Sequence, residues 1–142
     1  VELAAFEATQ SQVEIELELA GSLLQVTVDR VQIQQVCLNL IRNAIDALLL
    51  SPASERGILI ISGTTANGVE ISVADNGSGV DEKHRGTLFE PFLTTKDDGM
   101  GLGLSLSQSI VVSHGGTLTY APRDSGGSIF TFELPAGQAA DV

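Results

Sequence analysis

The sequence predicts an α+β fold, a two-layer α/β sandwich in which one mixed sheet is covered by helices on a single face. Two observations predict it: short β-rich runs occur in pairs, and helical patterns lie between these pairs. The chain has 142 residues, of which 43% are hydrophobic, which is enough for one domain with its own core. We find no internal repeat and no low-complexity linker that would divide it.

Six runs of the sequence are typical of strands. They span residues 12–19, 23–28, 57–65, 68–75, 117–121 and 128–135. The first two are expected to form a hairpin at Gly21. Asn67 and Gly68 separate the middle two, and because both residue types tolerate positive φ, they predict a tight turn with antiparallel pairing.

Two segments are typical of helices. Asp29 precedes the first and has Gln32 three residues later, the spacing of a capping box, so we expect a helix from there to about residue 50. Ser51-Pro52 then ends it. The second helix is expected over 103–114 and stops at Gly115-Gly116.

Charge and hydropathy exclude several classes of partner. The formal net charge of −11 argues against binding to nucleic acid or to an anionic membrane surface. The chain has no apolar run of about 20 residues and no signal-peptide pattern, which predicts a cytoplasmic location. The single cysteine, Cys37, lies among apolar residues and is interpreted as a small buried side chain rather than a reactive thiol.

The first predicted helix carries a polar stripe opposite an apolar one. The polar stripe contains Gln32, Gln35, Asn39, Asn43 and Asp46, and the apolar, core-facing stripe contains Ile33, Cys37, Leu40, Ile41, Ala44 and Leu48. A solvated face is one interpretation. Asparagine, however, is a poor residue for a helix interior, and amide oxygens suit Mg²⁺ that already carries phosphate charge. The pattern favours ligands over a solvated face.

Two glycine-containing segments are candidates for ligand binding. The stretch 94–109 places Lys96 and glycines two residues apart before a helix start, which suits a phosphate, although a flexible loop is the alternative. The second segment, Asp75 to Gly79, reads "DNGSG" directly after a strand. A carboxylate there could accept a hydrogen bond from an exocyclic amine such as that of adenine, although a tight turn looks the same. It does not fit a calcium loop or a dinucleotide fingerprint.

In order, the motifs "NLIRNAIDA" (39–47), "DNGSG" (75–79), "FEPF" (89–92), "TTK" (94–96), "GMGLGLS" (99–105) and "HGG" (114–116) resemble the conserved boxes of sensor histidine kinases. Each motif alone is weak, but their order, spacing and setting agree with one ATP-binding catalytic domain of the GHKL superfamily. That resemblance implies the Bergerat fold, with a mixed, mostly antiparallel sheet and helices on one face. It also implies ATP and Mg²⁺ as cofactors.

The resemblance implies roles for individual residues. Asn43 matches the Mg²⁺ ligand, Asn39 its neighbour facing the phosphates, and Asp75 the carboxylate that reads the adenine amine. Asn39, Asn43 and Lys96 are the expected catalytic residues. The residues expected to bind nucleotide are Asn39, Asn43, Asp46, Asp75, Gly77, Gly79, Lys96, Gly99, Gly101, Leu102, Gly103 and Ser128. Phe89 and Phe92 match aromatic anchors of the lid over the nucleotide, and an ordinary core role is the alternative.

Residue 39 also bears on the reaction. ATP-hydrolysing relatives carry a glutamate at this position to activate water, and asparagine cannot act as a base. The resemblance therefore implies transfer of the γ-phosphate to a histidine. His84 and His114 do not match the family's phosphorylated histidine and are interpreted as ordinary loop and helix-end residues.

We therefore expect the dimerisation and phosphoacceptor domain to lie upstream, with residues 1–12 as its trailing edge, 13–136 as the ATP-binding domain and 137–142 as a tail. The expected partners are that domain and, through it, a response regulator. The isolated domain is expected to be a monomer without membrane contact, although the parent protein can be membrane-anchored. The alternatives are a GHKL-fold ATPase, an anti-sigma serine kinase, and a degenerate module that has lost nucleotide binding.

Overall fold

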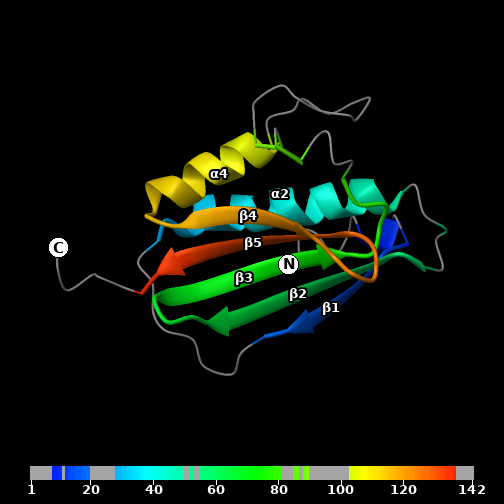
Figure 1. The fold of residues 1–142 in the computed structure, drawn as a ribbon, viewed down its shortest axis with the longest axis horizontal. Coiled ribbons are helices and arrows are strands. Elements are labelled where there is room, and N and C mark those ends of the chain that lie inside the picture. Colours follow the sequence, from blue (N-terminus) through cyan, green and yellow to red (C-terminus); the bar gives the residue numbers. More distant parts are fainter. Residues whose placement is uncertain are drawn as a thin grey trace.

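The computed structural model describes residues 8–10, 12–19, 28–49, 52, 55–80, 85–86, 88–89 and 103–136. Its elements are β1 (Glu14–Glu18), α2 (Arg30–Leu48), β2 (Gly57–Thr64), β3 (Gly68–Asp75), α4 (Gly103–Ser113), β4 (Thr117–Pro122) and β5 (Ser128–Pro135). The strands form one sheet in the order β1-β2-β3-β5-β4, and both helices lie on one side of it (Figure 1). The predicted two-layer α+β sandwich is confirmed.

The sheet is mixed. β1 and β2 run parallel, whereas β2 with β3, β3 with β5 and β5 with β4 are antiparallel. The expected strand at 23–28 lies outside the described residues except for Val28, which is not part of a strand. β1 pairs with β2, which is far along the chain. The expected hairpin at Gly21 lies outside the described residues.

The core lies between the sheet and the helices. Alternate residues of the strands point toward it, and the largest buried side chain, Phe132, has no exposed surface. On α2 the buried residues are Val36, Leu40, Ile41, Ala44, Ile45 and Leu48. Val36 and Ile45 were missing from the predicted stripe, and Cys37 is only half-buried. α2 packs against α4 as well as the sheet, so its apolar surface is wider than one stripe.

The predicted start of α2 is confirmed, but only half of its capping box forms. Asp29 has extended φ and ψ, and its Oδ1 accepts a hydrogen bond from the Gln32 N–H at 3.1 Å. In a capping box the Asp29 N–H would bond to the side chain of residue 32. Instead it donates to Nε2 of His114 at 3.0 Å. The helix cap is therefore completed by a residue at the end of α4.

His114 joins the two helices. Its Nε2 accepts from Asp29, so its Nδ1 carries the proton and donates to the Ile110 carbonyl at 2.8 Å. Gly115 follows with φ of +81° and ends α4, as predicted. The helix-end interpretation of His114 agrees with this geometry.

The explanation predicted for Gly68 is wrong. β2 and β3 do pair antiparallel across this turn, but neither Asn67 nor Gly68 has a positive φ. Gly68 lies in β3 beside β5, where a Cβ would collide with the Leu134 carbonyl oxygen. Glycine is required there because two backbones approach closely, not because the turn needs a left-handed residue.

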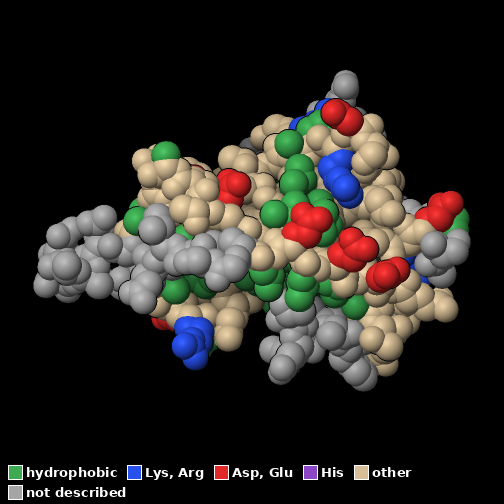
Figure 2. Space-filling view, turned by 90° about the horizontal axis from the view of Figure 1, so that it is seen from below, with side chains coloured by type: hydrophobic (Ala, Val, Ile, Leu, Met, Phe, Trp, Pro, Cys, Tyr) green, Lys and Arg blue, Asp and Glu red, His purple; other side chains and the backbone are tan. Residues whose placement is uncertain are grey.

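The strand β1 contributes acidic side chains to the surface of the sheet. Viewed from below, on the side where β1 lies, acidic side chains gather beside apolar ones (Figure 2). The exposed acidic residues of β1 are Glu14, Glu16 and Glu18. In the described part of the chain, no helix combines the length and apolar content of a membrane span.

Candidate functional site

Asp75 is the last residue of β3 and is buried, with 1% of its surface exposed. Its position follows from strand alternation, because it belongs to the same side of β3 as the core residue Val73. Its Oδ1 accepts a hydrogen bond from the Gly77 N–H at 2.9 Å. Burial raises the pKa of Asp75 above its ordinary value, whereas the backbone N–H groups of Gly77 and Ser128 and the charge of Arg123 lower it.

A buried carboxylate of this kind is costly to the fold and is typical of functional sites. Ser128, predicted to help around the adenine, is 3% exposed and pairs with Asp75 across β3 and β5. The structure therefore brings these two predicted residues together at one end of the sheet.

The glycines after Asp75 hold the loop against α2. A Cβ on Gly77 would lie 3.0 Å from both the Ala47 carbonyl oxygen and Oδ1 of Asp75. Gly79 has φ of +78°, a conformation that favours glycine. The loop therefore packs against the last turns of α2, one helical turn beyond Asn43. This contact brings the end of α2 close to Asp75.

The predicted residues on α2 differ in their exposure. Asn39 and Asn43 are half-buried, whereas Asp46, Gln32 and Gln35 are exposed. The Asn39 amide nitrogen donates to Oγ of Ser107 at 3.3 Å, and Ser107 is completely buried on α4. This bond links α2 to α4, the helix that follows the predicted lid. Sequence reasoning missed Ser107 because a serine inside an apolar helix carries no motif of its own.

Several predicted lid residues fall outside the described part of the chain. Lys96, Gly99, Gly101, Leu102 and Phe92 belong to this group. Gly103 is described as the first residue of α4, and a Cβ there would meet nothing within 4 Å. Phe89 packs edge-on against Phe130, with ring centroids 6.4 Å apart, and so anchors its segment on the core.

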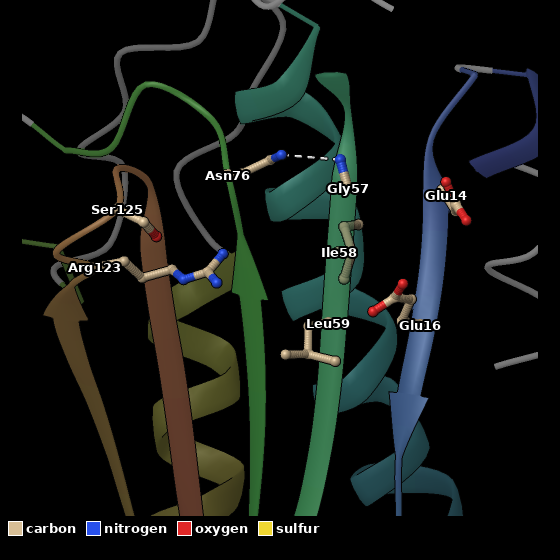
Figure 3. Close-up of a pocket in the computed structure, with 8 residues that line it drawn as sticks. All are labelled: Glu14, Glu16, Gly57, Ile58, Leu59, Asn76, Arg123 and Ser125. Atoms are coloured by element: carbon tan, nitrogen blue, oxygen red, sulfur yellow. Dashed lines mark hydrogen bonds between the residues drawn. The ribbon is translucent and has the colours of Figure 1, made fainter. Parts of the chain in front are cut away.

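A cavity of about 440 Å³ lies on the other face of the sheet (Figure 3). It is lined by Glu14, Glu16, Gly57, Ile58, Leu59, Asn76, Arg123 and Ser125. Asp75 is on the same side of β3 as the core residue Val73 and does not line this cavity, so the cavity is distinct from the candidate site at Asp75 and α2. Asn76 closes one end of it, where its Oδ1 accepts from the Gly57 N–H at 2.9 Å.

Comparison with protein families now decides the class. Residues 28–138 match the family of histidine kinase-, DNA gyrase B- and HSP90-like ATPases. The chain belongs to this family. The matched region includes α2, α4 and the strands β2 to β5, so it contains Asp75 and the polar residues of α2.

The relatives within this family are sensor kinases. The chain is 43% identical over 131 residues to the sensor protein FixL of Bradyrhizobium diazoefficiens, an alignment that covers 91% of this chain and 25% of FixL. The chain thus spans about a quarter of the length of that relative. It corresponds to the ATP-binding catalytic domain of a two-component sensor kinase.

Solved structures agree with this assignment. The catalytic domain of histidine kinase ThkA superposes with a TM-score of 0.83 at 33% identity, covering 96% of this chain and 87% of that one. Full-length ShkA in complex with AMPPNP gives a TM-score of 0.81 at 30% identity, covering 95% of this chain and 28% of ShkA. ThkA in complex with the response regulator protein TrrA gives 0.77 at 31% identity, covering 95% and 37%.

Proposed function

We propose that this domain binds Mg-ATP between the C-terminal half of α2 and the loop after β3. The observation that carries the proposal is Asp75, a carboxylate with 1% exposure held by the Gly77 N–H at the end of a strand. An ionised Asp75 accepts a hydrogen bond from the adenine amine, and Gly77 and Gly79 let the flat base approach the backbone. The AMPPNP complex of the similar ShkA supports this choice of ligand.

The phosphates and the metal are assigned to α2 and the lid. Asn43 contributes a neutral amide oxygen, so Mg²⁺ at this position would gain its negative ligands from the nucleotide phosphates. The bound ion would neutralise phosphate charge. Asn39, half-buried and hydrogen-bonded to Ser107, faces the same region, and Asp46 lies at the rim. Lys96, Gly99, Gly101, Leu102 and Gly103 remain our assignments for the lid over the phosphates.

We propose that the γ-phosphate is transferred to a histidine on another domain rather than to water. Asn39 stands where hydrolysing relatives carry a glutamate, and an amide cannot take a proton from water. Its nitrogen is already committed to the Ser107 hydroxyl, so it orients rather than reacts. Catalysis then rests on positioning and charge neutralisation. ThkA, solved with its response regulator, supports a regulator as the next acceptor.

Isothermal titration calorimetry with ADP and Mg²⁺ tests the nucleotide assignment. Asp75→Asn should weaken binding by about tenfold or more. The asparagine amide carries no charge, so the charge-assisted hydrogen bond is lost, and its N–H₂ group can face the adenine amine as a second donor. Glu70→Gln is the matched control, since Glu70 is an acidic residue of the same strand on the opposite face. Equal affinity of Asp75→Asn and Glu70→Gln would rule out Asp75 as the residue that binds the adenine.

A second measurement separates histidine transfer from hydrolysis. The purified domain should release phosphate from ATP at background rate, and Asn39→Glu should raise that rate by restoring a base. Rapid hydrolysis by the unmodified domain would contradict the assignment of Asn39 and favour an ATPase.

A further inference from the structure

Arg123 follows β4 and lies in the turn that connects it to β5. Its N–H donates to the Gly127 carbonyl at 3.2 Å, and its carbonyl accepts from Gly126 at 3.0 Å. Gly126 and Gly127 both have φ of +99°, so the turn is tight and depends on glycine. This backbone fixes where the Arg123 side chain begins.

The side chain crosses β5 to the end of β3. Its Nη1 donates to the backbone carbonyl of Asp75 at 2.9 Å, although the two residues are 48 positions apart. Figure 3 shows Arg123 lying over the sheet toward the end of β3, on the face away from the helices. Gly127 packs on the same carbonyl, where a Cβ would collide with the oxygen. The main chain of Asp75 is thus held by one turn.

We propose that, for the adenine site proposed above, Arg123 is the positioning residue of the purine-reading carboxylate. Its guanidinium clamps the Asp75 main chain from the opposite face of the sheet and sets a positive charge behind the Asp75 side chain. The role rests on nucleotide binding by Asp75. No motif marks Arg123, because its partner is reached only through the order of strands in the sheet.

The electrostatics agree with this geometry. Burial raises the pKa of Asp75 and favours its protonated form. The protonated form lacks the negative charge and is a weaker acceptor for the adenine amine than the carboxylate. Among the described residues, Arg123 is the charged side chain that lowers this pKa. Glu14 and Glu16 line the cavity with Arg123, and Asp46 is exposed on α2. Arg56 precedes Gly57 at the edge of the same cavity, where its guanidinium donates to the Leu49 carbonyl.

The proposal can be tested without nucleotide. The carboxyl carbon of Asp75 is followed by ¹³C NMR during a pH titration of the free domain, and its signal is assigned by its absence in Asp75→Asn. Three variants are compared with the unmodified protein. Arg123→Gln keeps a donor but removes the charge, Arg123→Lys keeps the charge, and Arg30→Ala removes a charge from the exposed start of α2, about 25 Å along the helix from Ala47.

Arg123→Gln should raise the Asp75 titration midpoint by about half to one pH unit, less than a fully buried pair would because solvent screens part of the charge. Arg123→Lys should stay closer to the unmodified protein, and Arg30→Ala should match it. In Arg123→Gln, ADP affinity should then begin to fall at a correspondingly higher pH.

Equal midpoints for Arg123→Gln and the unmodified protein would overturn the proposal, as would an equal shift in Arg30→Ala. A role in folding alone would lower the melting temperature of both Arg123 variants without separating their midpoints. Because the titration is read in the free domain, a failure of ADP to bind would refute the proposed function separately from the role of Arg123.

Discussion

Replacing Gly77 by alanine probes the contact that joins the β3 loop to α2. The new Cβ would lie 3.0 Å from the Ala47 carbonyl oxygen and from Oδ1 of Asp75, and 3.2 Å from the Ala47 carbonyl carbon. Two of these atoms belong to helix backbone, which cannot rotate away as a side chain can. Overpacking of this kind costs about 1–3 kcal/mol. For a domain of this size that corresponds to a melting temperature lower by about 3–10 °C.

Gly63→Ala is the matched control. Gly63 lies in β2, where a Cβ would meet nothing within 4 Å. Its stability change should stay within about 0.5 kcal/mol. Urea unfolding of both variants measures the free energies, and calorimetry with ADP measures affinity, which should fall about tenfold in Gly77→Ala as the Gly77 N–H moves from Asp75. Equal stability and equal affinity for the two variants would refute the packing of this loop on α2.

Three further outcomes are expected. Gly103→Ala should raise the free energy of unfolding by up to about 1 kcal/mol, because Gly103 lies in a helix with open space where a Cβ would be. The same change should weaken ADP binding, because we assign the Gly103 backbone to the phosphates. Unchanged affinity in calorimetric titrations would remove Gly103 from the site. His114→Ala should lower the free energy of unfolding, measured in urea, by about 1–2 kcal/mol, because the hydrogen bonds to Asp29 and Ile110 are lost. An unchanged free energy of unfolding would contradict the role of His114 in joining α2 and α4. Because burial raises the folded-state pKa of Asp75, the stability that its protonated form contributes is fully present below the unfolded pKa of about 3.9 and is lost as pH rises through the folded pKa. Asp75→Asn should therefore gain stability relative to the unmodified protein as pH rises above about 4, and a difference that does not change with pH would refute the burial of this charge.

Local chemistry made much of the fold predictable. Asp29 was recognised as a helix cap, and Gly115 as a helix stop, because both signals lie within a few residues of the element they end. The antiparallel pair of β2 and β3 was predicted for the same reason, because its two strands are separated by a short turn. Asp75 was predicted from its place in the ordered series of motifs, because a carboxylate before a glycine loop can equally mark a tight turn.

What the sequence could not predict depends on residues distant along the chain. The Asp29 N–H is taken by His114, 85 residues away, instead of by its neighbour in the capping box. Gly68 is required by the approach of β5, and Ser107 and Arg123 acquire their roles only when α4 and the β4–β5 turn pack beside the site. A local pattern contains none of these contacts.

The most direct test of nucleotide binding on the helix side of the sheet is a backbone NMR titration of the labelled domain with AMPPNP and Mg²⁺. We predict that the largest shift changes fall on Asn43, Asp75 and Gly77, while Glu14 and Glu16 in the opposite cavity stay unchanged. Changes concentrated at Glu14 and Glu16, with Asp75 and Gly77 unaffected, would contradict it.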